Sequence, residues 1–267
     1  MKNKERFPIL ITGTGPGNPD LLTVKAYEAI STADILLYDC MPAHYVLDIK
    51  REDAEIIYLC KTHEFTEDEL RGHIINVINN LEKCYNEGKK VVRLKSGDSF
   101  MYGGGGLEAS LLKSRGIPFE VIPGLTAGAA AANLYGVKIS EKDETDTVVY
   151  YIASNITDNF YQIRQIAKLL NIGATLVLYM ADDNLAKIIS VLKEEGIPGT
   201  IPTVVVGMAS LPDEDCASGA LDSITQEAAK KEMLMPFTYF IGTHVKATVQ
   251  NRTKMSVKTL KSHAGAC

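Results

Sequence analysis

Short apolar runs alternate with longer amphipathic stretches along the chain, and this alternation limits the fold more than any other feature of the sequence. Each run has the length of a strand, and each intervening stretch carries apolar residues at helical spacing. Strands that alternate with helices predict a parallel sheet with helical crossovers. In the first half, strands are predicted at residues 8–12, 35–38, 54–59, 90–94 and 119–122. Helices are predicted at 22–31, 42–48, 67–87 and 106–115, and a small-residue helix within 123–136.

The pattern resumes after the charged segment 140–146, which is polar enough to predict a solvated connection. The predicted elements of the second half are strands at 147–152, 175–179, 203–206 and 237–242 and helices at 161–170 and 185–195. The predicted fold class is therefore α/β, with two α/β domains and a crevice between them. We place the N-terminal domain at 1–125 and the C-terminal domain at 126–248. The basic tail 249–267 is weakly patterned, and we expect it to be disordered.

The composition fits a soluble globular protein. Of 267 residues, 46% are hydrophobic and 23% are charged, which is ordinary for that class. The net charge of −5 argues against a nucleic-acid partner, because such proteins usually carry a basic face. No apolar run approaches ~18 residues, so no membrane span is predicted. The N-terminal segment lacks a secretory apolar region, and we therefore expect a cytoplasmic location.

Five cysteines without a C-x-x-C pair are typical of reduced intracellular thiols. Cys40 and Cys60 each follow a predicted strand, and His63 lies nearby in the sequence, so a metal site is one interpretation. Small buried thiols at strand ends are the simpler interpretation, and we predict no metal.

Two glycine-rich loops follow predicted strands. The first lies in the segment 11–30, ITGTGPGNPDLLTVKAYEAI, and Asp39 ends the next strand about 20 residues later, which is the order of a dinucleotide-binding fold. An NAD site is therefore one interpretation, but Pro16 has no N–H to donate to a pyrophosphate. The second loop, RLKSGDSFMYGGGG at 93–106, has no counterpart in that fold. Ordinary turns are the alternative for both loops.

Three ordered motifs identify a family. They are GTGPGNPDLLTVKAYEAISTADILLYD, VVRLKSGDSF followed by GGG, and GIPFEVIPGLTAG. Together with TLVLYM at 175–180, they resemble the tetrapyrrole methylase family over residues 7–245. The resemblance implies a methyltransferase that uses S-adenosyl-L-methionine (SAM), releases S-adenosyl-L-homocysteine (SAH) and acts on a small-molecule tetrapyrrole. It also implies two α/β domains with SAM in the cleft between them, and usually a homodimer.

The resemblance implies a set of SAM contacts at matching positions. They are Pro16, Ser96, Gly97, Asp98, Met101, Thr126, Ala127, Met180 and Ala209. Glycine-rich turns let the backbone approach a cofactor closely, and Asp98 is able to accept from hydroxyl or ammonium groups. Small residues at 127 and 209 leave room for adenine. Met180 would form a soft apolar wall, with a core residue at a strand end as the alternative.

The resemblance also implies two catalytic residues, Asp39 and Lys61, at the positions of the family's acid and lysine. Methyl transfer from SAM depends on alignment more than on covalent help. The methylated ring must then lose a proton, and Asp39 is the candidate base. Lys61 would pair with a substrate carboxylate as a point charge. The alternatives are a helix N-cap for Asp39 and a solvated surface group for Lys61.

The sequence departs from the best-matching branch of the family on the substrate side. Gly104 replaces the arginine of F-G-R-G-G-E-E, and Glu141 and Lys142 replace the histidine and arginine of G-I-P-x-T-H-R-D. A family T-G-H becomes A-S-N, ending at Asn155. Loss of arginine removes bidentate carboxylate recognition, which lysine does not replace. Two other hypotheses therefore stay open: methylation of another precorrin or a less acidic substrate, and a non-catalytic SAM-binding module, against which the retained acid and lysine argue.

Overall fold

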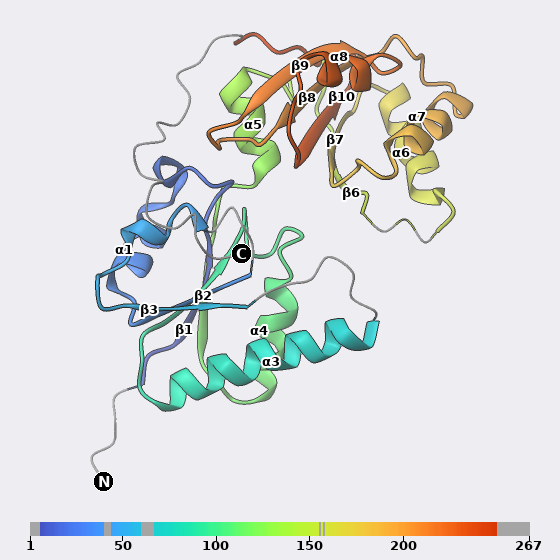
Figure 1. Ribbon diagram of the computed structural model, residues 1–267. Helices are drawn as coiled ribbons and strands as arrows, with labels where there is room; N and C mark the ends of the chain where they lie inside the picture. The colour runs from blue at the N-terminus through green and yellow to red at the C-terminus, as the bar shows by residue number, and fades with distance from the viewer. Residues whose placement is uncertain (1–5, 40–43, 60–66, 155, 157, 250–267) are drawn as a thin grey trace. The chain divides into compact units, whose positions relative to one another are not determined.

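The computed structural model describes residues 6–39, 44–59, 67–154, 156 and 158–249. They fall into two compact units, the first ending at Thr126 and the second beginning at Ala127. Each unit is built on one five-stranded sheet (Figure 1). Within the described residues, no helix has both the length and the apolar character needed to cross a membrane.

The first unit contains a parallel sheet. Its elements are β1 (Ile9–Gly13), the 3-10 turn η1 (Pro19–Leu21), α1 (Val24–Thr32), β2 (Ile35–Tyr38), the 3-10 turn η2 (Leu47–Ile49), β3 (Glu55–Tyr58), α3 (Glu67–Asn86), β4 (Val91–Lys95), α4 (Gly105–Ser114) and β5 (Phe119–Ile122). The strands lie in the order β3-β2-β4-β1-β5, and all neighbouring pairs are parallel. In a dinucleotide-binding sheet β1 and β2 are neighbours. Here β4 separates them, which excludes the NAD interpretation.

Side chains alternate between the two faces of this sheet, and helices cover both faces, as parallel sheets require (Figure 1). Ile35 and Leu37 of β2 pack with α3 and α4, whereas Leu36 packs with α1. Because the strand period is two, Asp39 continues the face that α4 covers. Arg93 has the same parity on the neighbouring strand β4, so sheet geometry alone brings these two charged residues to one side.

The second unit contains a mixed sheet. Its elements are α5 (Ala127–Tyr135), β6 (Val148–Ile152), α6 (Tyr161–Asn171), β7 (Thr175–Tyr179), α7 (Leu185–Glu194), β8 (Pro202–Gly207), β9 (Asp215–Ala220), α8 (Ile224–Lys230) and β10 (Phe237–Ile241). The strand order is β6-β7-β10-β8-β9; β6 and β7 are parallel, and the other pairs are antiparallel. Since β7 and β8 both run antiparallel to β10 between them, their carboxyl ends lie at the same edge.

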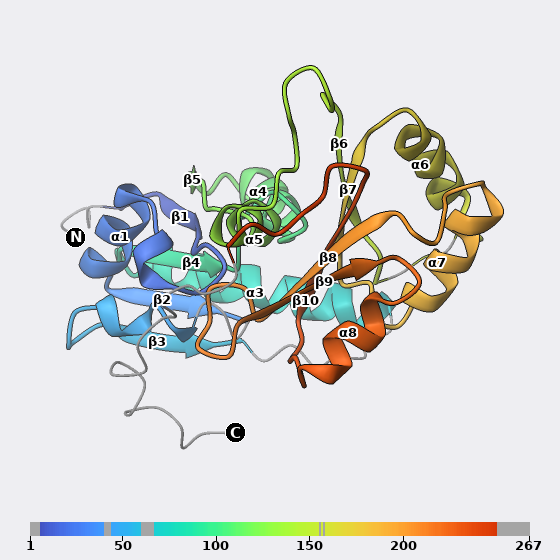
Figure 2. The same cartoon turned by 90° about the horizontal axis from the view of Figure 1, so that it is seen from above.

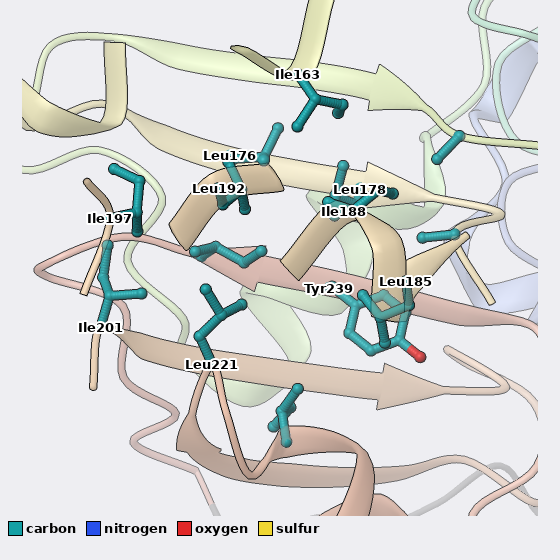
Figure 3. Packing of buried hydrophobic residues seen from close by; sticks show 14 of the residues in the cluster. Ile163, Leu176, Leu178, Leu185, Ile188, Leu192, Ile197, Ile201, Leu221 and Tyr239 are labelled. Carbon is teal, nitrogen blue, oxygen red and sulfur yellow. The ribbon is translucent and has the colours of Figure 1, made fainter. Parts of the chain in front are cut away.

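Both faces of the second sheet are also covered. In Figure 2, α5 lies on one side of this sheet, where Ala131 and Ala132 pack, and α6, α7 and α8 lie on the other. Figure 3 shows the core on the side of α6, α7 and α8, in which Leu176 and Leu178 of β7 pack with Leu192 of α7. Full burial of one such side chain contributes about 1.5–3 kcal/mol. This core therefore holds the end of β7, where a predicted SAM contact lies, in a fixed place.

The α/β class and every predicted strand are confirmed within a residue or two. Among the strands and α-helices of the described residues, two are additional. β9, with the sequence DCASGA, is an edge strand built of residues with weak strand preference, and α8 has only seven residues. The segment 140–146 is a turn inside the second unit, where the Glu141 N–H donates to the Thr145 carbonyl (3.1 Å), and not a connection between halves. The predicted helix at 42–48 lies partly outside the described residues, and the tail beyond residue 249 lies wholly outside them.

Candidate cofactor site and active site

Three loops meet at the carboxyl edge of the first sheet. The loop after β1 pairs with the loop after β4, because the Gly15 N–H donates to the Gly97 carbonyl (3.1 Å) and the Gly97 N–H donates to the Gly15 carbonyl (2.8 Å). Thr14 strengthens the contact, since its N–H and its hydroxyl donate to the Lys95 carbonyl at 2.8 and 3.0 Å. The two glycine-rich loops predicted from the sequence are therefore one structure, at the edge where open α/β sheets bind ligands.

The loop after β5 completes this junction, which we call the three-loop junction (residues 13–17, 96–98 and 123–124). A Cβ on Gly13 would lie 2.6 Å from the Gly124 nitrogen, and a Cβ on Gly124 would lie 2.2 Å from the Gly97 oxygen. Atoms do not approach so closely without contact strain, so these positions require glycine for space. Gly97 also has a φ of 65°, a left-handed conformation that favours glycine.

Asp98 holds the junction together. Its Oδ1 accepts from the Phe100 N–H (2.9 Å) and the Met101 N–H (3.1 Å), and its Oδ2 accepts from the Gly124 N–H (3.2 Å). One carboxylate therefore fixes the loop that leads to α4 and ties it to the loop after β5. The sequence predicts Asp98 as a direct partner of a ligand, whereas the structure gives it three backbone partners.

The remaining predicted contacts of the first unit lie beside this junction. Pro16 is buried between two glycines, Ser96 follows β4 directly, and Thr126 ends the unit. Ser99 is fully buried, and its hydroxyl has no hydrogen-bond partner among the described residues. An orphaned hydroxyl in such a loop is a polar group that a ligand would satisfy.

In the second unit, the predicted contacts lie at one edge of the sheet. Met180 follows β7, and Ala209 follows β8, whose carboxyl ends share that edge. Ala127 begins α5, which is tied to β7 because the Gly128 N–H donates to the Tyr179 hydroxyl (3.0 Å). The Met180 side chain is 57% exposed, so it is not the core residue considered as the alternative.

The backbone at this edge is strained. Met180, Met208 and Ser210 have φ of 50°, 49° and 66°, although none is glycine. Non-glycine residues in this region cost on the order of 1–3 kcal/mol each and cluster at functional sites. Met180 is itself a predicted SAM contact, and Met208 and Ser210 flank the other one, Ala209.

Four charged side chains form a buried cluster on the first sheet. We call it the buried charge cluster, and it consists of Asp39, Arg93, Lys95 and Glu108. Arg93 Nε and Nη2 donate to the two Glu108 oxygens at 3.0 and 2.9 Å, and Arg93 Nη2 also lies 2.5 Å from Asp39 Oδ2. Lys95 Nζ lies 2.8 Å from Glu108 Oε1 and 3.6 Å from Asp39 Oδ2. The sequence analysis missed Arg93, Lys95 and Glu108. The signal was two cations at alternate positions of the otherwise apolar strand VVRLK, which place both on one face.

Mutual attraction keeps Arg93 and Glu108 ionised. Burial alone would lower the pKa of Arg93, but the carboxylates of Glu108 and Asp39 outweigh it and raise that pKa further above its ordinary value. Burial alone would raise the pKa of Glu108, but Arg93 and Lys95 outweigh it and lower that pKa. Both groups therefore carry full charge at neutral pH.

Several predicted positions cannot be placed in this geometry. Lys61, Asn155, Cys40, Cys60 and His63 lie outside the described residues. Within the part of the chain that the structure describes, no group of three or more His, Cys, Asp or Glu side chains could hold a metal ion.

Two of the positions at which the sequence departs from the best-matching branch of the family lie among the described residues. Gly104 precedes α4 with a φ of 72°, and no atom lies within 4 Å of a Cβ built there. An arginine there would have space but a strained backbone. Glu141, which replaces a histidine, forms an ion pair with Lys138.

The fold and these loops define an α/β protein whose glycine-rich loops gather at the carboxyl ends of its strands, the edge where open α/β sheets bind ligands. The chain belongs to the tetrapyrrole (corrin/porphyrin) methylases, whose family model matches residues 8–225. This confirms the family that the three sequence motifs predict.

Relatives and solved structures agree with this family. Uroporphyrinogen-III C-methyltransferase of Bacillus subtilis (strain 168) is 35% identical over 234 residues, which cover 88% of this chain and 89% of the relative. A siroheme synthase of Psychrobacter cryohalolentis is 32% identical over 88% of this chain, but the chain spans only 44% of that longer protein.

Two solved structures share the fold over most of the chain. Uroporphyrin-III C-methyltransferase from Thermus thermophilus, in complex with SAH, has a TM-score of 0.71 at 26% identity, over 88% of this chain and 97% of that one. A cobalt precorrin-4 methyltransferase has a TM-score of 0.75 at 26% identity, over 88% and 94%.

Replacing Gly124 with alanine is expected to lower the free energy of unfolding by roughly 1–3 kcal/mol, the usual cost of overpacking, because the new Cβ would meet the Gly97 oxygen. Gly72→Ala in α3 is the matched control, since no atom lies within 4 Å of its Cβ position. It is expected to be neutral or to stabilise by up to about 1 kcal/mol. Urea unfolding followed by circular dichroism measures both, and equal effects of the two substitutions would contradict the crowding at the junction.

Proposed function

We propose that this chain is a SAM-dependent C-methyltransferase that methylates uroporphyrinogen III at C2 and C7, using two SAM molecules in succession, and forms precorrin-2. The observation that carries the proposal is the paired backbone of Gly15 and Gly97 at the carboxyl edge of the first sheet. Support comes from the uroporphyrinogen-III C-methyltransferase of Bacillus subtilis, because the matched region covers nearly the whole length of that relative. Support for the cofactor comes from the Thermus thermophilus neighbour, which was solved with SAH.

The described residues fit SAM as the cofactor. In the first unit we assign Pro16, Ser96, Gly97, Asp98, Met101 and Thr126 to the site, and in the second unit Ala127, Met180 and Ala209. In the first unit, the Ser99 hydroxyl has no hydrogen-bond partner among the described residues, and in the second unit Met180 is exposed, so each unit by itself offers one group of the kind that SAM needs, the first polar and the second soft and apolar. Because the Asp98 oxygens already accept three backbone N–H groups, we assign Asp98 to holding the loop and the neighbouring backbone to contacting the cofactor.

The chemistry divides between the cofactor and the chain. When bound, SAM supplies an electrophilic methyl group on a sulfonium centre. The chain aligns the substrate carbon with that group, which is where most of the rate gain of such a displacement arises. Methylation of a pyrrole carbon leaves positive charge on the ring, and the ring then releases a proton. We assign the Asp39 carboxylate to this ring, where it counters the charge and is the candidate proton acceptor.

We assign Lys61 to a substrate carboxylate, as a point charge that a family lysine at the matching position would provide. We also propose that the enzyme is a cytoplasmic homodimer. The family resemblance supports the dimer. The thiols of Cys84 and Cys216, which are free and have raised pKa values because of burial, support a reducing compartment.

A second candidate is a methyltransferase for another precorrin or a less acidic tetrapyrrole. It is favoured by Gly104, which cannot offer the bidentate fork of the arginine found in the best-matching branch. The ion pair of Glu141 with Lys138 favours it as well, because an acid stands where that branch has a histidine. Both candidates use the same cofactor site.

The two candidates are separated by turnover of uroporphyrinogen III with SAM. Uroporphyrinogen methylation is expected to release SAH and to give the coloured trimethylated product on prolonged reaction. Calorimetric titration with SAH and with NAD is the control, and only SAH is expected to bind. A well-folded protein that binds SAH but leaves uroporphyrinogen unmethylated would contradict the first candidate and favour the second.

Replacing Asp39 with asparagine is expected to lower kcat roughly 100-fold or more, because the fixed negative charge is lost, and to leave SAH affinity unchanged. Asp53→Asn is the matched control, since the Asp53 carboxylate is 73% exposed and pairs with Arg51. It is expected to change neither quantity. Equal loss of SAH affinity and turnover in Asp39→Asn would indicate a structural or cofactor role for Asp39 instead.

A further inference from the structure

The buried charge cluster has a cost that its own ion pairs only partly offset. Removing each charged group from water is unfavourable, and a buried pair is often no more stabilising than a well-packed apolar pair. The cluster places two cations and two anions on one face of the first sheet, beneath α4. Such groups, held next to a candidate active site, point to a functional reason for their burial.

The cluster is graded from the interior toward the surface. The Arg93 side chain is 0% exposed, those of Lys95 and Glu108 are 7% exposed, and that of Asp39 is 12% exposed. Glu108 accepts from both cations, and both cations reach the same Asp39 oxygen. The Arg93 guanidinium is further fixed because its Nη1 donates to the Leu94 carbonyl (3.1 Å). Glu108 therefore orients the two cations, and the cations orient Asp39.

We propose that Arg93, Lys95 and Glu108 are positioning residues that keep Asp39 ionised and pointed in one direction, so that substrate meets a permanent anion at the end of β2. The kinetic part of this inference rests on the proposed function, whereas the ionisation of Asp39 does not. Opposite charges at these distances favour the ionised form of a carboxylate by a large factor.

Among the residues that the structure describes, the groups near Asp39 do not oppose this assignment. On its own strand, the Tyr38 hydroxyl lies 3.3 Å from His44 Nδ1, and on β3 the Tyr58 ring lies 4.9 Å from the Tyr38 ring. Glu108 on α4 is the acid of the cluster that would compete for the cations, and it engages Arg93 with both oxygens and Lys95 with one. The two cations remain shared with Asp39. A carboxylate held ionised by the cluster is in the form that both counters the charge of the ring and is able to accept its proton.

The ionisation of Asp39 is measured by NMR on the full-length protein labelled with ¹³C at the aspartate carboxyl carbon, with the Asp39 signal assigned by its loss in Asp39→Asn. In the wild type, this signal is expected not to titrate above about pH 4. In Arg93→Met, removal of the adjacent positive charge is expected to raise the midpoint by roughly 1–3 pH units. Arg115→Met is the matched control, because Arg115 pairs with Glu82 in the same unit and is expected to leave the midpoint unchanged.

Arg93→Met removes one of the two cations that pair with the buried Glu108 carboxylate, and this loss could prevent folding. Two further variants therefore keep the test decisive. The double variant Arg93→Met with Glu108→Gln removes a buried pair together, and Lys95→Met removes the more distant cation; circular dichroism checks the fold of each. A rise of the Asp39 midpoint is expected in both and is expected to be smaller in Lys95→Met. An unchanged midpoint in the folded variants would overturn the inference.

The pH profile of kcat/KM supplies the kinetic test. Because ionised Asp39 is the active form, the acid limb is expected to move to higher pH by the same amount as the NMR midpoint, a shift that a purely structural role would not produce. A shifted midpoint with an unmoved acid limb would overturn the positioning role. A protein that methylates no tetrapyrrole would contradict the proposed function and leave the NMR result as the test of the network.

Discussion

The carbonyl oxygen of Gly97 lies where a side chain on Gly124 would have to be, and Gly13 lies against both residues. This close approach of three backbone segments fixes the loops after β1, β4 and β5 relative to one another. Glycine supplies the space, and Asp98 supplies the hydrogen bonds that hold the segments in place. The start of α4 and the exit from the first unit both depend on this arrangement, since the same loops lead into them. The predicted SAM contacts of the first unit are therefore members of one rigid edge.

Much of this architecture follows from the sequence, because the alternation of strands and helices is governed by local periodicity. The glycine loops were identifiable for the same reason, since a strand that stops at clustered glycines has few other conformations. The sheet order was not predictable, and it is the order of β1, β4 and β2 that rules out the dinucleotide interpretation. β9 and α8 escaped prediction because DCASGA and a seven-residue helix carry weak local preferences that packing overrides. The Gly124 partner of Asp98 and the Arg93 partner of Asp39 come from distant segments, which periodicity cannot pair.

The residues that indicate the family and the residues that would recognise the substrate lie in different parts of the molecule. Residues that define the class lie in the loops and strand ends, where we propose that the backbone contacts the cofactor, and they agree with the tetrapyrrole methylases. Residues that would recognise a highly carboxylated substrate are fewer, since Gly104 offers no side chain and Glu141 is an acid. The buried cluster of Arg93, Lys95, Glu108 and Asp39 has two cations and two anions, and its most exposed member is the Asp39 carboxylate at the end of β2. A site of this kind is suited to a ring that becomes cationic during reaction.

Hydrogen–deuterium exchange in the presence and absence of SAH tests most directly whether the three-loop junction is the cofactor site. Peptides that cover residues 13–17, 96–101 and 123–126 are expected to exchange more slowly when SAH is present. The helix α3 lies away from these loops in the sequence and serves as the internal reference, because a general stabilisation of the fold would slow its exchange equally. Selective slowing at the junction is the predicted result. Slowing elsewhere, with these loops no more affected than α3, would contradict the account.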